Sequence, residues 1–230
     1  MSTLIVALRA QDGMVLAGDS RGTVGDPRGL TAIRDTETKL FKLSDYAGMG
    51  IAGSSELAAS VFDVLKPHIE RENLMYIDEI MQKAREVVKQ SYDDWFAKFT
   101  IDKRPGLLTI LCGYKKVDDG KLEPKTYLLA SNLDFAPQLF PDGNTLVGVV
   151  QYAVYLQHRF YDAAMTYKQA CRLAAYLITE TATQDPKVGG PVKMAVIRPA
   201  GFAWVEDDEI KKMIELNEKE NKRMREFFKG

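Results

Sequence analysis

Short β-prone runs alternate with pairs of amphipathic helices along this chain of 230 residues, and their order limits the folds open to it. Strands are expected at residues 3–9, 14–19, 39–43, 47–53, 107–114, 126–131, 192–197 and 202–205, and helices at 55–66, 77–97, 151–162, 166–182 and 207–228. Single strands alternating with helices would indicate a parallel sheet, but here the strands come in runs. The order ββββ, αα, ββ, αα, ββ, α therefore predicts an α+β fold in which helix pairs cover antiparallel sheets.

Local signals set several of these boundaries. Residues 77–97 carry a continuous apolar stripe at helical spacing, which is typical of a core-facing helix. Pro67 is expected to kink or end the preceding helix, because proline lacks the N–H that a helix interior needs. Thr166 and Gln169 form a capping-box signature at the start of a later helix. The glycine-rich segment from Gly22 to Gly29 is expected to be a loop.

The composition is that of a globular protein, with 46% hydrophobic and 27% charged residues, and one domain is expected for residues 1–230. The net charge of −1 gives no bulk field that would favour nucleic acid or an anionic membrane. No apolar stretch reaches the roughly 20 residues of a membrane-spanning helix, and the first apolar run ends at the turn Asp12-Gly13, as a strand would. Cys112 and Cys171 lie in apolar runs and are expected to be reduced core residues, which suits the cytoplasm.

Several common catalytic chemistries have little support. The two histidines, His68 and His158, are isolated, which disfavours Ser-His and Cys-His catalysis and zinc hydrolysis. There is no glycine-rich phosphate loop, and no cofactor or metal is expected. Residues 18–22 match Gly-x-Ser-x-Gly, but a nucleophile elbow needs a helix directly after it, and a glycine-rich loop is expected here.

Thr3, Asp19 and Lys39 form the remaining candidate constellation, and each lies at an end of a predicted β element. A hydroxyl needs a base and a favourable electrostatic environment before it becomes a good nucleophile. By spacing alone, a buried structural Asp–Lys pair is the better interpretation of these residues.

Two blocks of sequence change that interpretation. The first comprises residues 3–7 (Thr-Leu-Ile-Val-Ala) and 12–23 (Asp-Gly-Met-Val-Leu-Ala-Gly-Asp-Ser-Arg-Gly-Thr). The second comprises residues 39–43 (Lys-Leu-Phe-Lys-Leu) and 48–53 (Gly-Met-Gly-Ile-Ala-Gly). Together they closely resemble the opening of proteasome β subunits and of HslV, the bacterial proteasome-like peptidase. The segment between the blocks is a few residues longer than usual in that family, and weaker similarity extends to about residue 205.

The resemblance implies a four-layer αββα sandwich, with two antiparallel sheets between helix layers. It also implies that Thr3 is an N-terminal nucleophile whose own α-amine, with an ordinary pKa of roughly 7.7–8.0, acts as base and acid. By the same resemblance, Lys39 eases deprotonation of the Thr3 hydroxyl, and Asp19 keeps Lys39 charged and oriented. The backbone N–H of Gly53 stabilises the oxyanion, and Asp185 belongs to the same expected catalytic set.

Other matching positions imply where a peptide would bind. Two positions of the family bind extended peptide backbone or brace the site, and they correspond to Arg21 and Thr23. Three further positions line the pocket for the side chain before the scissile bond: Gly22, Ile51 and Ser55. That pocket is expected to be moderately apolar, with Glu37 as its one candidate charged group.

Two departures from the family pattern bear on activity. The family usually has two serines near the amine of the nucleophile, but Val149 and Val188 stand there, and valine makes no side-chain hydrogen bond. In addition, Met1 and Ser2 must be removed before the amine of Thr3 is free. Attack of the Thr3 hydroxyl on its own preceding carbonyl could remove them. The alternative is that Ser2 serves as the nucleophile, one residue out of register.

The leading hypothesis is a threonine-type endopeptidase subunit of a self-compartmentalising double-ring protease in the cytoplasm. The resemblance implies homo-oligomeric rings of six or seven subunits, seven being preferred, that act on peptides or unfolded proteins. An ATP-driven unfoldase is a compatible partner, although the sequence shows no motif for its docking. Two alternatives stay open: a catalytically inert ring or scaffold subunit, and a small-molecule amidase on the same fold.

Overall fold

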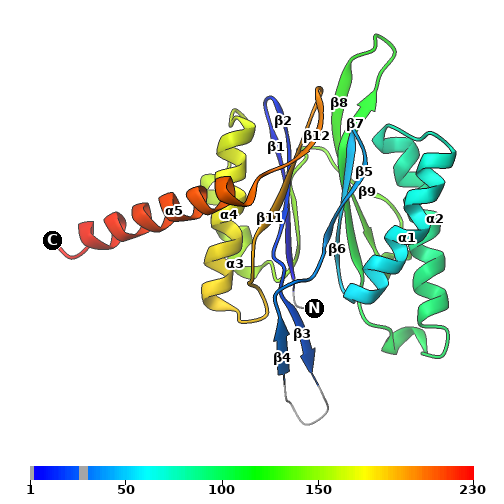
Figure 1. The fold of residues 1–230 in the computed structure, drawn as a ribbon, viewed down its shortest axis with the longest axis horizontal. Helices are drawn as coiled ribbons and strands as arrows, with labels where there is room; N and C mark the ends of the chain where they lie inside the picture. The colour runs from blue at the N-terminus through cyan, green and yellow to red at the C-terminus, as the bar shows by residue number, and fades with distance from the viewer. Residues whose placement is uncertain (1–2, 26–30) are drawn as a thin grey trace.

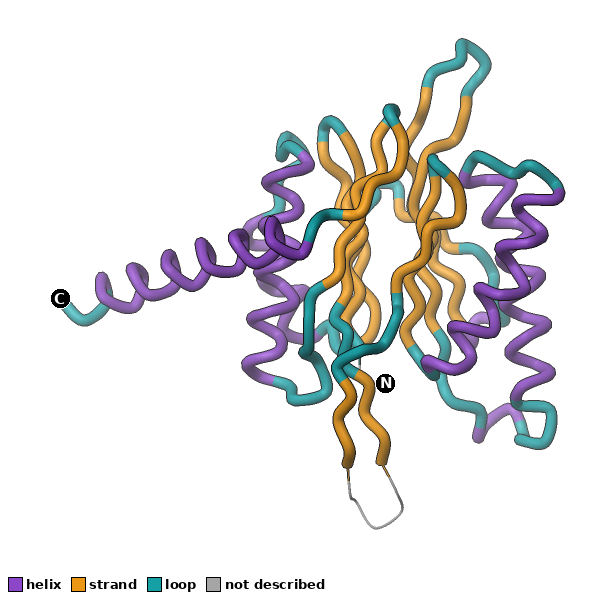
Figure 2. The backbone as a smooth tube through the Cα atoms, viewed as in Figure 1, coloured by secondary structure: helices purple, strands orange, loops and turns teal. Residues whose placement is uncertain are grey.

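Four layers make up the part of the chain that the computed structural model describes, which is residues 3–25 and 31–230. A helix pair, two antiparallel five-stranded sheets and a second helix pair lie one on another (Figure 1). The tube view in Figure 2 shows the two sheets face to face, with the helices outside them. The expected α+β, four-layer αββα sandwich is confirmed.

Both sheets are antiparallel throughout. The first has the strand order β10 (Thr145–Gly148), β1 (Leu4–Ala10), β2 (Gly13–Gly18), β11 (Lys193–Arg198) and β12 (Gly201–Trp204). The second has the order β5 (Leu40–Ser44), β6 (Ala47–Ala52), β7 (Leu108–Lys116), β8 (Leu122–Ala130) and β9 (Gln138–Phe140). The pairs β1–β2, β5–β6, β7–β8 and β11–β12 are joined by short connections, as antiparallel pairing permits. The neighbouring strands β6 and β7 are instead connected through the helix pair on the second sheet.

Five α-helices are described. α1 (Ser55–Arg71) and α2 (Ile77–Trp95) cover the second sheet, whereas α3 (Gln151–Phe160) and α4 (Tyr167–Gln184) cover the first. α5 (Asp207–Phe227) crosses α4 and projects from the body. Two short 3₁₀ turns lie at Ile101–Lys103 and Ser131–Leu133. None of the helices in the described residues combines the length and apolarity needed to span a bilayer.

Side-chain alternation along β1 explains how the layers hold together. Leu4, Val6 and Leu8 pack into a cluster with the α4 side chains, whereas Ile5 and Ala7 pack between the two sheets. Successive side chains of a strand point to opposite faces, so a strand between two covered faces is apolar almost throughout. The apolar N-terminal run is therefore a central strand, which places residue 3 at the edge of the sandwich interior.

The prediction that Gly22–Gly29 form a loop is wrong for Gly22–Gly25. β3 (Gly22–Gly25) and β4 (Thr31–Arg34) form an antiparallel hairpin, with Thr23 opposite Ile33. The glycines conceal the strand signal, because glycine is depleted in strands. The hairpin lies in the segment that is longer than usual for the resembled family, and residues 26–29 of the predicted loop lie outside the described residues.

Pro67 was expected to kink or end its helix, and the helix does not end there, since α1 continues to Arg71. A proline removes one intrahelical hydrogen bond. Leu65 and Ile69 are buried on either side of it, in the cluster beneath α1 and α2. Their packing carries the apolar face of the helix through its last turn and offsets the lost bond.

The remaining boundaries of strands and helices differ less from the prediction. The charged turn predicted from Lys115 to Glu123 is shorter, because β7 runs to Lys116 and β8 begins at Leu122. The short strands β9 and β10 were not predicted, since three or four residues carry too little pattern. The capping box of α4 is confirmed: the Gln169 N–H donates to Thr166 Oγ1 at 3.4 Å, and the Thr166 N–H donates to Gln169 Oε1 at 2.8 Å.

Candidate active site

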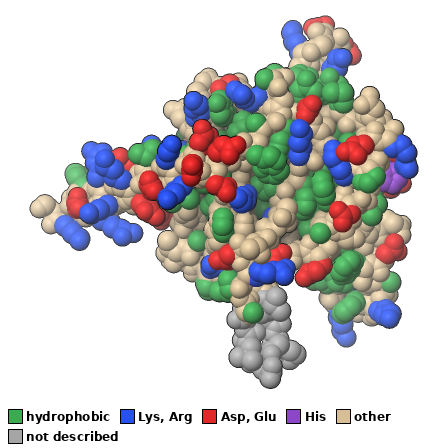
Figure 3. Space-filling model, viewed as in Figure 1, with side chains coloured by type: hydrophobic (Ala, Val, Ile, Leu, Met, Phe, Trp, Pro, Cys, Tyr) green, Lys and Arg blue, Asp and Glu red, His purple; other side chains and the backbone are tan. Residues whose placement is uncertain are grey.

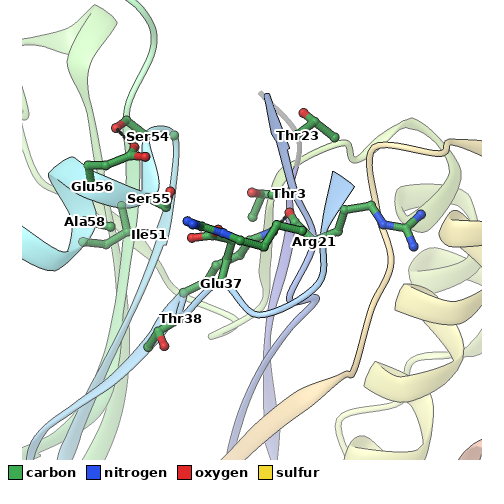
Figure 4. Close-up of a pocket in the computed structure, with 14 residues that line it drawn as sticks. Thr3, Arg21, Thr23, Glu37, Thr38, Ile51, Ser54, Ser55, Glu56 and Ala58 are labelled. Atoms are coloured by element: carbon green, nitrogen blue, oxygen red, sulfur yellow. Dashed lines mark hydrogen bonds and ion pairs between the residues drawn. The ribbon is translucent and has the colours of Figure 1, made fainter. Parts of the chain in front are cut away.

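A cavity of about 330 Å³ opens at one end of the sandwich and collects most of the predicted site. Nine of the residues singled out from the sequence line it: Thr3, Arg21, Gly22, Thr23, Glu37, Lys39, Ile51, Gly53 and Ser55. Figure 4 shows Ile51, Ser55 and Ala58 on one side of this cavity, with Thr3 facing them from the other. Asp19 lies directly beside Lys39, whereas Asp185 is not among the residues that line the cavity.

Two hairpins bring these residues together. Thr3 precedes β1 and Asp19 follows β2, while Lys39 precedes β5 and Gly53 follows β6. In an antiparallel hairpin the start of the first strand lies beside the end of the second, as Ile5 beside Gly18. Each sheet therefore contributes two of the four positions at the same end of the sandwich.

Thr3 is held in place through its backbone. The residue is only 2% exposed, and its carbonyl oxygen accepts a hydrogen bond from the Val149 N–H at 2.8 Å. The next residue, Leu4, donates its N–H to Asp19 Oδ1 at 3.0 Å. Gly148 allows the close approach: it has φ +97°, and a Cβ there would lie 1.8 Å from the Thr3 carbonyl oxygen. The backbone at Thr3 is thus fixed by both of the strands next to β1.

Asp19 and Lys39 form a buried ion pair beneath the cavity. Lys39 Nζ lies 2.8 Å from Asp19 Oδ1 and 2.7 Å from the carbonyl oxygen of Arg21. Burial lowers the pKa of the Lys39 ammonium group, and the neighbouring Asp19 carboxylate opposes that shift. Asp19 also accepts the backbone N–H groups of Arg21 and Gly189 at 3.2 and 3.1 Å. The charge of the Lys39 ammonium group is thereby held at the cavity wall to which Thr3 also belongs.

Gly53 lies between the end of β6 and the start of α1. Its φ of +155° suits glycine, and a Cβ there would lie 2.6 Å from Leu107 Cδ1. Ser54 caps α1 by accepting the Leu57 N–H at 3.3 Å, and Ser54 and Ser55 line the cavity. A helix N-terminus carries a partial positive charge. Gly53 thus lines the cavity next to the N-terminus of α1, whose Ser55 lies on the side opposite Thr3 (Figure 4).

Arg21 lines the cavity, but its guanidinium group points away from it (Figure 4). Its guanidinium group binds Asp35 through Nε at 2.8 Å and Nη2 at 2.9 Å, and Nη1 donates to the Pro186 carbonyl oxygen at 3.1 Å. The hydrogen bond from Arg21 holds the pKa of the Asp35 carboxyl below its ordinary value. Of the two roles expected for Arg21, these contacts correspond to bracing the site.

The expectation of a moderately apolar pocket with one charged group is wrong. Arg34 and Glu56 line the cavity together with Glu37. Arg34 Nε lies 2.5 Å from Glu37 Oε1, and Ser54 Oγ donates to Glu56 Oε2 at 2.9 Å. The backbone N–H of Glu56 itself and the Ser54 hydroxyl lower the pKa of the Glu56 carboxyl. Arg34 was missed because it belongs to β4, a strand that the sequence did not predict.

Three further predicted positions lie apart from the cavity lining. Asp185 ends α4, and its Oδ1 accepts the Lys187 N–H at 2.8 Å. Val149 and Val188 are 6% and 0% exposed and belong to the apolar cluster around Leu4 and Val6. The valines therefore extend the core beneath Thr3 where serines are usual in the resembled family. Residues 1–2, whose removal was predicted, lie outside the described residues.

Within the described ranges, 3–25 and 31–230, no three His, Cys, Asp or Glu side chains gather closely enough to hold a metal ion. The chemistry available to the described residues is that of a hydroxyl, a buried ammonium–carboxylate pair and backbone N–H donors.

Comparison with known proteins agrees with this geometry. The proteasome subunit family matches residues 1–197. A proteasome subunit beta of Methanosphaera stadtmanae is 28% identical over 215 residues, covering 90% of this chain and 92% of that protein. One of Methanopyrus kandleri is 24% identical over 215 residues, covering 92% and 95%. One of Saccharopolyspora erythraea is 48% identical over 56 residues, covering 24% and 18%. The chain belongs to the proteasome subunit family.

Proposed function

We propose that this chain is a threonine-type endopeptidase subunit with Thr3 as its N-terminal nucleophile. The observation that carries the proposal is that Thr3, Lys39 and Gly53 line one cavity, with Lys39 bonded to the buried Asp19. The residue types suit the chemistry, because a threonine hydroxyl needs a base and a nearby positive charge before it attacks a carbonyl. Peptide-bond hydrolysis at this cavity is the activity that the family and the geometry support together.

The proposed reaction begins when the free α-amine of Thr3 accepts the proton of its own hydroxyl. The Thr3 oxygen then bonds to the substrate carbonyl carbon, and the Gly53 N–H stabilises the resulting oxyanion. The protonated amine returns the proton to the leaving amine as the C–N bond breaks, which leaves an ester on Thr3. Water, activated by the same amine, hydrolyses the ester. Lys39 favours the deprotonated hydroxyl throughout, because its charge lies at the same wall.

Maturation must expose that amine. We propose that the Thr3 hydroxyl attacks the Ser2 carbonyl carbon, so that the C–N bond between Ser2 and Thr3 breaks as an ester forms between Ser2 and the Thr3 oxygen. Water then hydrolyses this ester, which releases Met1 and Ser2 as a dipeptide and leaves the amine and the hydroxyl of Thr3 free. The alternative, with Ser2 as the nucleophile after loss of Met1, would place the hydroxyl one residue further from the fixed Thr3 backbone. Strand β1 fixes the register at Thr3, through the Val149 and Asp19 contacts of residues 3 and 4. That register supports Thr3 over Ser2.

Assembly follows from the family, whose members form rings. We propose homo-oligomeric double rings of six or seven subunits, seven being preferred, in the cytoplasm. Peptides or unfolded proteins are the proposed substrates, and an ATP-driven unfoldase is a compatible partner. Arg34, Glu37 and Glu56 support a pocket that accepts polar or charged side chains before the scissile bond.

An inert ring or scaffold subunit is the second candidate, and two observations favour it. Val149 and Val188 bury apolar side chains beneath Thr3, where the resembled family has serines. Asp185, which belongs to the expected catalytic set, accepts the Lys187 N–H and is not among the residues that line the cavity. With these partners missing, orientation of the α-amine would rest on the backbone at Thr3 and on water.

Intact mass spectrometry and peptide turnover separate the candidates. The peptidase predicts loss of Met1 plus Ser2 from the purified protein, and hydrolysis of fluorogenic peptides. Thr3→Ala should retain Ser2 and show no hydrolysis, whereas Thr183→Ala, an exposed threonine at the end of α4, should behave like the wild type. A mass that retains Ser2 together with no turnover would favour the scaffold. Faster turnover of simple acylated amines than of peptides would favour the amidase.

A further inference from the structure

The charges around the cavity at Thr3 do not balance. Three cations line it, and each has a carboxylate partner. The pairs are Arg21 with Asp35, Arg34 with Glu37 and Lys39 with Asp19. Glu56 also lines the cavity, and among residues 3–25 and 31–230 it forms no ion pair of its own. Three cations against four carboxylates leave a net charge of −1, and Glu56 is the group that is not balanced.

Glu56 is held in place by neutral groups. Its carboxylate accepts hydrogen bonds from its own backbone N–H and from the Ser54 hydroxyl, the second at 2.9 Å. Figure 4 shows Glu56 on the side of the cavity where Ile51 and Ala58 lie. Neutral donors orient a carboxylate and favour its ionised form, but they do not cancel its charge. The apolar side of the cavity thus ends in a fixed negative charge.

Glu37 supplies a second carboxylate, and Figure 4 shows it nearer to Thr3. The Glu37 N–H donates to the Ser20 carbonyl oxygen at 2.9 Å. The Glu37 side chain is only 9% exposed and packs against Gly22, where an added Cβ would lie 2.7 Å from Glu37 Cγ. These contacts leave the side chain little room to move, so the two carboxylates of the cavity are both fixed.

Arg34 is the least fixed of the charged groups at the cavity. It is the last residue of β4, and its side chain is 63% exposed. Its hydrogen bond to Glu37, and then the charges of Glu37 and Glu56, raise the pKa of the Arg34 guanidinium group, so Arg34 interacts with both carboxylates. An exposed ion pair contributes little to stability, because water solvates both charges when they separate. Another cation can therefore take the place of Arg34. Arg34 and its neighbours on the outer surface are seen with the other charged side chains in Figure 3 as mixed blue and red groups above the hairpin.

We propose that the cavity selects peptides with a lysine or arginine side chain before the scissile bond, that Glu37 and Glu56 bind the charge of that side chain, and that Arg34 occupies its position until the peptide enters. The inference deepens the proposed function and rests on its assignment of this cavity to the side chain before the scissile bond.

The two ends of a basic side chain suit the two parts of the cavity. Its methylene stem is apolar and packs on Ile51 and Ala58, while its charged head reaches the carboxylates. An acidic side chain would meet both carboxylates and would have to draw Arg34 away from Glu37, so it is disfavoured. An apolar side chain would gain the packing without the attraction, and its affinity should lie between the two.

Peptide binding to the Thr3→Ala variant tests this selection without any chemistry. The ligands are three tripeptide amides that differ only in their last residue, which is lysine, norleucine or glutamate, and isothermal titration calorimetry gives their affinities. Norleucine has the apolar stem of lysine without its charge. The lysine peptide should bind about five- to tenfold more tightly than the norleucine peptide, and the glutamate peptide should bind most weakly. Added sodium chloride should narrow these differences, because salt screens partly exposed charges.

Single substitutions in the same background assign the effect to residues. Glu56→Gln keeps an oxygen that can accept the Ser54 hydroxyl, and it should bring the affinities of the lysine and norleucine peptides close together. Arg34→Gln should widen the difference, because it removes the competing cation. The matched controls are Glu70→Gln on α1 and Arg85→Gln on α2, which remove the same charges at exposed positions outside the cavity lining. Both controls should keep the original difference.

Equal affinities of the three peptides, tighter binding of the glutamate peptide, or no binding of any of them would overturn the inference. Equal effects of Glu56→Gln and Glu70→Gln would overturn it as well. Labelling of the wild type by a peptide epoxyketone, which needs the Thr3 hydroxyl and free amine, reports on the proposed function alone. A protein that prefers the lysine peptide but is not labelled has the selective cavity without the chemistry, and a labelled protein without that preference has the reverse.

Discussion

At the scale of single residues, the ammonium group of Lys39 links the stability of the fold to the proposed chemistry. Its side chain is 7% exposed, and its partner Asp19 is fully buried. A buried charge is tolerated only when a counter-charge and hydrogen bonds replace the water around it. Asp19 supplies the counter-charge, and its other bonds, from Leu4, Arg21 and Gly189, hold it in place.

Asp19→Asn should therefore destabilise the protein and change its pH dependence. Leaving Lys39 buried without its carboxylate should lower the free energy of unfolding by about 3–5 kcal/mol. Asp19 opposes the lowering of the Lys39 pKa, so its loss should lower that pKa further. Lys39 would then lose its charge at a lower pH, and the alkaline limb of the activity profile should move to lower pH.

Denaturant titration and pH–rate profiles check this prediction. The matched control is Asp45→Asn, which removes the partner of Lys42 at an exposed ion pair. Exposed pairs contribute roughly 0–1 kcal/mol, so the control should change neither stability nor the profile appreciably. Equal effects of the two substitutions would show that burial of the Asp19–Lys39 pair has no special role.

Gly148→Ala tests the backbone that holds Thr3. A Cβ at Gly148 would lie 1.8 Å from the Thr3 carbonyl oxygen, and its φ of +97° is strained for alanine. The substitution should cost more than the about 1–3 kcal/mol of a strained backbone conformation and should abolish peptide turnover. Gly120→Ala is the control, since Gly120 has φ +72° but no atom within 4 Å of the added carbon. The control should lose some stability, measured by thermal unfolding, and keep full turnover.

At the scale of secondary-structure elements, the capping box of α4 makes a separate prediction. α4 covers the first sheet and anchors α5, so its N-terminus contributes to two interfaces. Thr166→Ala removes the oxygen that accepts the Gln169 N–H and should destabilise the protein by about 1 kcal/mol, within a range of roughly 0.5–2. Lys168→Ala, at an exposed position of the same helix turn, should change the unfolding midpoint little. Equal shifts for both variants in urea unfolding would contradict the capping role.

The elements that could be predicted are those with a strong periodic pattern. Helices 77–97 and 166–182 lie within two residues of α2 and α4, because long apolar stripes and a capping box mark them. The β3–β4 hairpin could not be predicted, since its glycines suppress the strand signal and its pairing depends on tertiary context. The continuation of α1 past Pro67 depends on the burial of Ile69, and this burial cannot be predicted from the neighbouring sequence alone.

The candidate site likewise contains residues that could be predicted from the sequence and residues that could not. Thr3, Asp19, Lys39 and Gly53 were predictable because they lie at strand ends within two recognisable blocks, and hairpin pairing brings strand ends together. Arg34 and Glu56 were not, because their place in the cavity depends on how β4 and α1 pack across it. The ion pair between Arg21 and Asp35 could not be predicted either, because the β3–β4 hairpin brings Asp35 to the guanidinium group of Arg21.

At the scale of the whole molecule, the cavity belongs to both halves of the sandwich. The first sheet supplies Thr3 and the second supplies Gly53, while the apolar layer between them, with Ile5 and Ile110, fixes their separation. The two cysteines are buried core residues, as predicted, and burial raises the pKa of each thiol to about 12. Thiol-directed inhibitors should therefore leave peptide turnover unchanged, which a titration with N-ethylmaleimide under native conditions checks.

The central claim is that Thr3 becomes a working N-terminal nucleophile, and covalent labelling tests it most directly. A peptide epoxyketone bonds to both the hydroxyl and the free amine of an N-terminal threonine. After incubation of the wild-type protein with the inhibitor, tandem mass spectrometry should find one adduct on a peptide that begins at Thr3, with Met1 and Ser2 absent. Recovery of an unmodified N-terminal peptide that still contains Ser2, in a folded and assembled sample, would contradict the claim.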